Sequence, residues 1–554
     1  MRRRKTTTVL SLAVLLIAAT ATACRTTAEP GTATGTEGTA TGTASGSPTG
    51  SGSEVDSVTL PASLTAQKLR WKPCPAPSVL QGADGRPGKL PDGTAWQCTT
   101  MKAPLDYAKP DGETIDLALI RAEAKPKTES KGRIGSLVFN FGGPGSSGVA
   151  SLPQFAADEY MKLHERYDLV SFDPRGIGNS GGVRCLDDKA LERWLAADTT
   201  PDDATELRQL RTRSKAFIQA CEKNSGRILP HVDTVSAARD MDLMRQLLGD
   251  RRLNYFGISY GTELGGVYAH LFPEKVGRTV LDAVVDPTQD DAAVALSQAK
   301  GFQLALENFM KDCAKEPDCP TGSGPAARKN TDAGIRKITA LLKRLDSKPL
   351  KAGVDGGELT QAEALTGMAA ALYGKETWVM LKSGLRDAMK KDGDGRWLQF
   401  LADFYNGRDK NGRYNNLQSA YTAVICADSS DRYTEQDVLD RLPDFRDASP
   451  VFGESMAWTL LTCSGWKVRE GSSRTVEVSA KGAEPIVVIG TTGDPATPYE
   501  GARRMAEQLG EGVGVEVAYK GEGHGAYPGS DCVTDAVDSY LLDGKVPADG
   551  TVCS

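Results

Sequence analysis

The serine at the centre of Gly257-Ile-Ser-Tyr-Gly261 is the residue of this 554-residue chain best suited to act as a nucleophile. The apolar run from Leu253 to Gly257 predicts a strand before it, and a helical pattern from Tyr260 to His270 follows. A sharp turn between a strand and a helix exposes a serine hydroxyl, and flanking glycines make room for it because they carry no Cβ. The helix dipole also favours negative charge developing at Ser259. The motif therefore predicts nucleophilic catalysis by Ser259.

A serine nucleophile needs a general base, and the chain contains only four histidines: His164, His231, His270 and His524. At a turn of this kind the partners follow the serine in the order acid, then histidine, which leaves the last two. We expect His270, in the helix that leaves the motif, to pack beside the sheet. His524 lies in a glycine-rich loop after a strand, from which its ring can reach across a site. We predict that His524 is the base.

The acid is expected in a loop after the strand that precedes the histidine. Pro485 to Gly490 predicts that strand, and Asp494 follows it in Thr491-Thr-Gly-Asp-Pro-Ala-Thr-Pro498. A carboxylate there would hold the imidazole in the required tautomer and stabilise the imidazolium. The alternatives are that Asp494 only caps the helix after Pro498, or that Glu522, close to His524 in sequence, is the acid.

Two glycine-rich loops follow other predicted strands. Phe141-Gly-Gly-Pro-Gly-Ser-Ser-Gly148 leaves backbone N–H groups available, and we predict an oxyanion hole formed by Gly143 and Tyr260, worth roughly 3–4 kcal/mol per donor. No Gly-Lys-Ser/Thr follows, so the loop does not fit a phosphate-binding loop. The second loop is Asp173-Pro-Arg-Gly-Ile-Gly-Asn-Ser180, in which we expect Asp173 and Arg175 to pair and stiffen the rim of the site.

Strands that alternate with helices must position these residues, and they predict an α/β fold with a doubly wound, mostly parallel sheet. In such a sheet the chemistry lies beyond the carboxyl ends of the strands. The predicted strands are 114–122, 136–141, 167–172, 253–257, 276–285, 485–490 and 515–519.

Between Pro287 and about Glu470 helical periodicity dominates, which predicts a helical cap inserted between two strands. An independent helical domain is the alternative. The predicted organisation is a signal peptide at 1–23, a flexible tether at 24–56, a core in two parts at 57–290 and 471–554, and a mostly helical cap at 291–470.

The N-terminus predicts export. Met1-Arg-Arg-Arg-Lys5 is basic, Val9 to Ala19 is apolar, and small residues lead to Cys24, as in a secretory signal peptide. The segment resembles a bacterial lipobox, in which the cysteine is acylated, although Ala21 stands where leucine is usual. We expect either a lipid anchor on Cys24 at the outer face of the cell membrane or plain secretion.

Eleven cysteines are present, an odd number, and setting Cys24 aside leaves ten that can form five disulfides in an oxidising compartment. The simplest pairing is sequential: Cys74–Cys98, Cys185–Cys221, Cys313–Cys319, Cys426–Cys463 and Cys532–Cys553. The spacing does not prove this connectivity. No C-x-x-C pair occurs, so we expect no structural zinc site. We also expect no other metal and no cofactor.

A net charge of −6 argues against a nucleic-acid partner, which would need a clustered basic surface. Beyond the first two dozen residues no run of eighteen apolar residues occurs, so membrane contact is expected only through a lipid anchor. We expect a monomer.

From about residue 65 to the end, the chain resembles the secreted tripeptidyl aminopeptidases and the broader prolyl-aminopeptidase-like serine peptidases, which have the α/β-hydrolase fold. The motifs that carry the resemblance are Gly142-Gly-Pro-Gly145, Asp173-Pro-Arg-Gly176, Gly257-Ile-Ser-Tyr-Gly261, Gly493-Asp-Pro-Ala-Thr-Pro498, Gly523-His-Gly525 and the segment from Cys532 to Cys553. The resemblance implies release of short peptides from a free N-terminus through an acyl-enzyme. Phe141 stands where the prolyl branch often has histidine, which favours the tripeptidyl branch.

Such an exopeptidase must bind the substrate ammonium group. Ile425-Cys-Ala-Asp428 looks like a family feature, and Asp428 is a candidate amine anchor, or alternatively a structural carboxylate beside a Cys426–Cys463 disulfide.

Two rival functions remain. The same three residues would serve a carboxylesterase or lipid esterase, because serine chemistry does not separate ester from amide. The second rival is a surface lipoprotein that binds a ligand without catalysis.

Overall fold

A ten-stranded sheet organises the part of the chain that the computed structural model describes, which is residues 58–82, 85–126, 132–352, 357–467 and 478–554. These residues form one unit. The predicted signal peptide, tether and Cys24 lie outside them. None of the described helices is long and apolar enough to cross a membrane.

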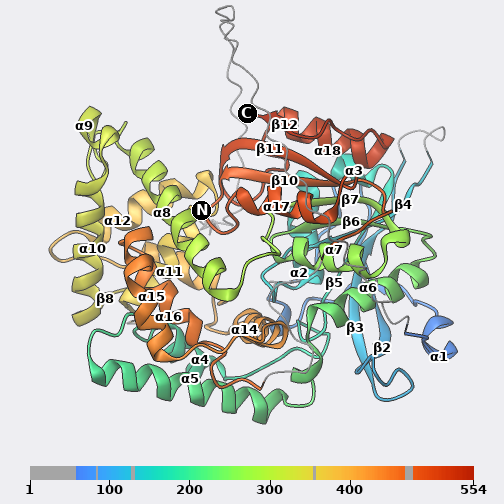
Figure 1. The fold of residues 1–554 in the computed structure, drawn as a ribbon, viewed down its shortest axis with the longest axis horizontal. Helices are drawn as coiled ribbons and strands as arrows, with labels where there is room; N and C mark the ends of the chain where they lie inside the picture. The colour runs from blue at the N-terminus through green and yellow to red at the C-terminus, as the bar shows by residue number, and fades with distance from the viewer. Residues whose placement is uncertain (1–57, 83–84, 127–131, 353–356, 468–477) are drawn as a thin grey trace, which may run out of the picture. The chain divides into compact units, whose positions relative to one another are not determined.

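The strands follow the order β1-β2-β3-β5-β4-β6-β7-β10-β11-β12 (Figure 1). From β5 to β12 neighbouring strands are parallel, while β1 to β3 and the β3–β5 pair are antiparallel. The bounds are β1 Lys72–Pro73, β2 Gln97–Pro104, β3 Thr114–Ala122, β4 Gly135–Asn140, β5 Tyr167–Phe172, β6 Leu253–Ile258, β7 Val276–Asp282, β10 Ile486–Gly493, β11 Gly514–Glu522 and β12 Thr551–Cys553. The predicted doubly wound, mostly parallel fold is confirmed, and the antiparallel edge is an addition to it.

Helices cover both faces of this sheet, because its central strands are apolar on both sides. One face packs against α2 (Gly148–Glu159), α3 (Met161–His164) and α18 (Asp531–Asp543). The other packs against α6 (Thr234–Leu248), α7 (Tyr260–Leu271) and α17 (Glu500–Leu509). The helices therefore leave the carboxyl ends of the strands uncovered, at the edge that meets the cap.

The segment between β7 and β10 is mostly helical and lies on the left of Figure 1. It consists of α8 Asp291–Cys313, α9 Gly324–Lys329, α10 Asp332–Ser347, α11 Gln361–Leu372, α12 Trp378–Ala388, α13 Arg396–Tyr405, α14 Leu417–Asp428, α15 Glu435–Ala448 and α16 Gly453–Trp458, with the small pair β8 Leu350–Lys351 and β9 Glu358–Leu359. Most of it surrounds apolar clusters of its own. Helix α14 differs, because Ala423, Val424 and Ala427 are buried in the cluster against the sheet.

Two helices that the sequence analysis did not anticipate lie between β5 and β6: α4 (Asp188–Leu195) and α5 (Ala204–Ser225). Figure 1 shows α5 beneath α15 and α16. Leu207 and Leu210 of α5 pack against the apolar cluster that α15 and α16 share. The covering over the sheet edge is thus built from two insertions.

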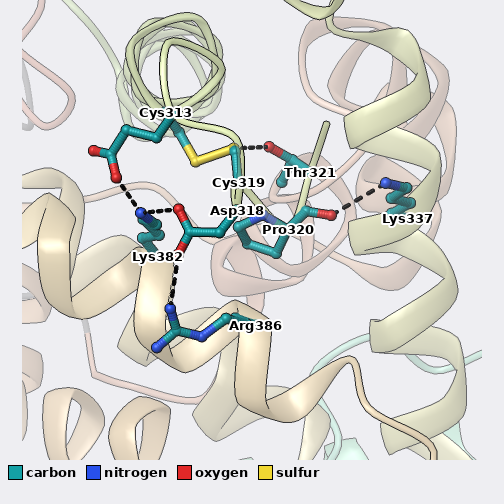
Figure 2. Close-up of a disulfide and its surroundings, with 9 residues drawn as sticks. Cys313, Asp318, Cys319, Pro320, Thr321, Lys337, Lys382 and Arg386 are labelled. Carbon is teal, nitrogen blue, oxygen red and sulfur yellow. Dashed lines mark hydrogen bonds and ion pairs between the residues drawn. A yellow bond between two sulfur atoms is a disulfide. The ribbon is translucent and has the colours of Figure 1, made fainter. Parts of the chain in front are cut away.

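Five disulfides join the cysteines in the sequential order that the simplest pairing predicts. Figure 2 shows the Cys313–Cys319 disulfide, which closes a short loop at the end of α8. Asp318 in that loop accepts hydrogen bonds from Lys382 Nζ at 2.6 Å and from an Arg386 guanidinium nitrogen at 3.1 Å, both on α12. The loop therefore ties two cap helices together.

Arg175 is completely buried, and its partner is Asp240 of α6, at 2.7 Å from both Nε and a terminal nitrogen. The expected pairing with Asp173 is wrong. Asp173 instead accepts hydrogen bonds from Ser147 Oγ at 2.6 Å and Gln81 Nε2 at 2.8 Å. Two residues apart on a turn, the two side chains diverge to opposite sides of it.

Asp240→Ala should destabilise the protein strongly, because it leaves the buried Arg175 guanidinium without its counter-charge. We expect a loss of about 3–5 kcal/mol in the free energy of unfolding, measured by urea denaturation. Asp116→Ala breaks an exposed ion pair with Lys102 and serves as control, with a loss within about 1 kcal/mol. Equal effects of the two variants would contradict this role of Asp240.

Candidate active site

Ser259 lies at a strained turn between β6 and α7. Its φ of 59° and ψ of −126° fall in a region that residues other than glycine rarely adopt. A Cβ on Gly257 would lie 2.3 Å from the Gly261 oxygen, and one on Gly261 would lie 2.7 Å from the Asn140 oxygen. At both positions the neighbouring backbone comes too close to leave room for a side chain, so both glycines are required. The turn packs against β4.

Asp494 and His524 form a direct pair across the ends of β10 and β11. His524 Nδ1 lies 2.9 Å from Asp494 Oδ1 and 3.0 Å from Oδ2. The carboxylate also accepts hydrogen bonds from the Ala496 and Thr497 backbone N–H groups, both at 2.9 Å, and from Thr497 Oγ1 at 3.0 Å. The carboxylate of Asp494 is fully buried and in contact with His524 Nδ1, which is the position that the predicted orienting acid must take.

The alternatives for these two positions do not fit the geometry. Helix α17 begins at Glu500 with Tyr499 at its N-cap, so Asp494 does not cap it. Glu522 accepts hydrogen bonds from Asn308 Nδ2 at 3.1 and 3.2 Å. His270 lies in the last turn of α7, where its Nδ1 is 2.9 Å from the Ser479 oxygen.

The electrostatic surroundings of His524 favour its charged form. Burial alone lowers the pKa of the imidazole, but the charge and hydrogen bond of Asp494, together with the charge of Asp282, raise it above its usual range. A base with a raised pKa accepts a proton readily and loses activity when it is already protonated.

The glycine loop after β4 packs directly on the serine turn. The Gly142 N–H donates to Asn140 Oδ1 at 2.9 Å. A Cβ on Gly142, where φ is +79°, would lie 2.6 Å from the Ile258 oxygen and 2.8 Å from Ser259 Cβ. Gly143 and Tyr260 line the same cavity as Ser259. The glycine loop and the first residue of α7 thus both lie beside the serine, and the oxyanion hole formed by Gly143 and Tyr260 stays a prediction.

Two residues that the sequence analysis missed hold the histidine loop. The His524 N–H donates to the Tyr373 oxygen at 2.7 Å, and the two rings meet edge to face with centroids 5.0 Å apart. Asp282, the last residue of β7, accepts hydrogen bonds from the Ala526 and Tyr527 N–H groups. Only the tertiary fold brings these residues beside the histidine, because neither belongs to a recognisable local motif.

Asp428 lies beside the Cys426–Cys463 disulfide and holds Thr234 of α6. Its carboxylate accepts hydrogen bonds from the Thr234 N–H and Oγ1, both at 2.7 Å, and Thr234 Oγ1 in turn lies 2.5 Å from the Tyr260 hydroxyl. Burial, and then the charges of Glu263 and Asp233, hold the pKa of Asp428 well above its usual range. Asp428 is not among the residues that line the cavity. Three carboxylates in the described part of the chain are: Glu263, one helical turn after Ser259, Asp286 and Glu500.

A cavity of about 450 Å³ opens above Ser259. This volume lies within the range of roughly 300–1,000 Å³ common for ligand sites. The core, the α4–α5 insertion and the cap all contribute to its walls, among others through Gly143, Ser259, Glu263, Trp194, Leu210, Phe302, Tyr373, Tyr405, Tyr421 and Thr497. Its walls are mostly apolar and aromatic, which suits an uncharged chain segment better than a highly charged ligand.

In the described residues, the acidic side chains close enough to share a metal ion are Asp202, Asp203 and Glu206. They lie at the start of α5, where Asp203 Oδ1 accepts from the Glu206 N–H at 2.9 Å and Glu206 Oε2 accepts from the Asp202 N–H at 2.8 Å. Helix capping accounts for this arrangement.

Known proteins resemble this chain over most of its length. The family model described as "TAP-like protein" matches residues 449–553, which contain Asp494 and His524. The chain is 36% identical to serine protease Hip1 of Mycobacterium tuberculosis over 88% of its length and 91% of the relative. It is 34% identical to carboxylesterase B of the same species, covering 83% and 86%, and 31% identical to tripeptidyl aminopeptidase of Streptomyces lividans, covering 83% of both chains.

Gly142→Ala should lower kcat by roughly 10- to 100-fold, because the added Cβ pushes the glycine loop away from the serine turn. Gly249→Ala is a matched control, since its φ of +80° is the same but no atom lies within 4 Å of the added Cβ. We expect the control to lose some stability and keep its kcat. Steady-state kinetics on both purified variants measure the effect, and equal kcat values would contradict it.

The acidic limb of kcat/KM against pH should have its midpoint above pH 6.5, because the base must be neutral and its pKa is raised. Asp494→Asn removes the charge that raises it, so the midpoint should move to lower pH while kcat falls by about 10³- to 10⁴-fold. A pH–rate profile of both proteins measures this. An unmoved midpoint would mean that another group controls the limb.

Proposed function

Because the chain belongs to the family of TAP-like α/β-hydrolases that these relatives represent, we propose that it is a serine exopeptidase with Ser259, His524 and Asp494 as its catalytic residues. It releases short peptides, tripeptides in particular, from free N-termini through an acyl-enzyme. The observation that carries the proposal is the strained serine turn at the floor of a covered cavity. Tyr373 and Thr497, which line that cavity, also contact the Asp494–His524 pair.

Each residue has a defined task in this reaction. His524 takes the hydroxyl proton of Ser259 through Nε2 as the oxygen attacks the scissile carbonyl, and Asp494 holds Nδ1–H and stabilises the imidazolium. The N–H groups of Gly143 and Tyr260 stabilise the oxyanion. His524 then gives the proton to the leaving amine, and water releases the acyl group by the same steps.

The cover favours exopeptidase action over cleavage within a long chain. The cavity is walled by α4–α5 on one side and by α8, α11 and α14 on the others, so a polypeptide reaches Ser259 most easily by one end. Burying a free ammonium group requires an opposite charge. Asp428, predicted from the sequence, is one candidate to supply it. Of the carboxylates that line the cavity, Asp286 pairs with Arg504 at 3.4 Å and Glu500 is exposed. Glu263, which is 6% exposed, is therefore the second candidate.

Esterase action is the second candidate, because the carboxylesterase B relative covers as much of the chain as the tripeptidyl aminopeptidase does. The catalytic residues would act identically on an ester.

Export with a lipid anchor on Cys24 is a further part of the proposal. The ten other cysteines are paired in disulfides, which suits an oxidising compartment and leaves Cys24 as the remaining thiol. Mass spectrometry of the protein isolated from its native membrane tests acylation, and an unmodified Cys24 in the mature chain would exclude it.

A mixed peptide pool analysed by mass spectrometry should show short N-terminal products with wild-type protein and none with Ser259→Ala. Peptides with acetylated N-termini should be spared. Parallel rates on Ala-Pro-Ala-type anilides and on butyrate esters separate the two candidates. Rapid ester turnover without peptide release would replace the exopeptidase proposal by the esterase.

Glu263→Gln and Asp428→Asn are a matched pair for locating the amine anchor. The variant that removes the true anchor should lose about 10-fold or more in kcat/KM on peptides with a free N-terminus, because a charge-assisted hydrogen bond contributes roughly 1.5–3 kcal/mol. The same variant should lose little on acetylated peptides. A carboxylate that only supports the fold should affect both substrates equally. Unchanged ratios in both variants would exclude both residues.

A further inference from the structure

We propose that Asp282 is a positioning residue that holds the nucleophile turn and the histidine loop at a fixed spacing. Its backbone oxygen binds the nucleophile turn, and its carboxylate binds the histidine loop. The proposal rests on the assigned roles of Ser259 and His524.

Asp282 is the last residue of β7, between β6 and β10, where it pairs with Ile258 and Ile489. Its backbone oxygen accepts a hydrogen bond from the Ser259 N–H at 3.1 Å. Its carboxylate accepts from the Ala526 N–H at 3.0 Å to both oxygens, and from the Tyr527 N–H at 2.9 Å. One residue therefore contacts the turn that carries the nucleophile and the loop that carries the base.

Backbone strain marks the same place. Among the described residues other than glycine, only Ser259 and Ala283 have a positive φ, and Ala283, at +56°, directly follows Asp282. Such strain persists only where the surrounding contacts determine the conformation, and it concentrates at functional sites. Here the neighbouring chain is also tied to the serine turn, because Thr262 Oγ1 donates to the Ser259 oxygen at 2.6 Å and accepts from the Val285 N–H at 3.0 Å.

The contacts suit a carboxylate at this position. Both partners in the histidine loop are N–H donors, and the Ala526 nitrogen lies 3.0 Å from each oxygen of Asp282. An asparagine would offer one acceptor and turn an NH₂ group toward a donor or away from the loop. Burial raises the pKa of Asp282 to about 6. The charge of Asp494 also raises this pKa, whereas the two N–H donors and the charge of His524 lower it.

Asp282 is not a second catalytic acid, because Nδ1 of His524 is held by Asp494. Its effect on the reaction passes through the spacing between the Ser259 turn and the His524 loop, both of which it binds. A displacement of about 1 Å between a nucleophile and its base can cost on the order of 100-fold in rate.

Asp282→Asn should lower kcat at least 10-fold with KM within about twofold of the wild type. Labelling of Ser259 by a fluorophosphonate probe should slow by a similar factor, because the probe reports activation of the serine without the peptide substrate. Asp168→Asn is the matched control. Asp168 is also buried and accepts a backbone N–H, from Ala124 at 2.8 Å, but it lies at the amino end of β5, away from the site.

We expect the control to lose stability, measured by thermal unfolding, and to keep its kcat and labelling rate. Asp282→Asn with wild-type kcat and labelling would overturn the proposal, as would a loss explained by the unfolded fraction alone. If Asp282→Asn does not fold, Asp282→Glu keeps the charge and both acceptors but displaces the loop, and should still lower kcat. Wild-type kcat in that variant would equally overturn the proposal. Labelling without any peptide release would refute the exopeptidase function while leaving the test of Asp282 intact.

Discussion

The parallel pairing of β6, β7, β10 and β11 is the constraint on which the site depends. Parallel neighbours end at the same edge of a sheet, so residues far apart in the chain meet there once the register is set. Ser259, Asp282, Asp494 and His524 each lie within two residues of the end of one of these strands. Because one face is covered by α2, α3 and α18 and the other by α6, α7 and α17, a one-residue slip would turn the side chains of a strand toward the wrong set of helices and disrupt the packing on both faces. The packing energy of the core thus maintains the distances between these four residues.

Charge around the site is strongly one-sided. Asp494, Asp282 and Glu263 are buried within or beside the catalytic region, Asp428 is half-buried behind it, and His524, which is cationic when protonated, touches Asp494. Such an environment favours a protonated imidazole during the reaction and a positively charged group on the ligand. It also explains why Asp494, Asp282 and Asp428 accept hydrogen bonds from backbone N–H groups, and two of them also from a threonine hydroxyl, since a buried negative charge needs donors.

The sequence was enough to predict the residues of the proposed triad, because a glycine-bounded turn, chain order and the small number of histidines each leave local evidence. The strands carrying them were predicted within a few residues for the same reason. The sequence did not reveal Asp282, Tyr373 or the α4–α5 insertion, since their importance comes from contacts between distant segments. The mistaken Asp173–Arg175 pair shows the same limit: Arg175 finds Asp240 on α6, and nothing in the spacing indicates that meeting.

The hydrogen bond from the His524 N–H to the Tyr373 oxygen joins the reacting base to the end of a cap helix. The loop that carries the imidazole is thus held from two sides: from the sheet by Asp494 and Asp282, and from the cap by the Tyr373 oxygen. The cap is therefore a structural part of the site as well as its cover, because the packing that ends α11 beside Tyr373 helps to set the position of the ring.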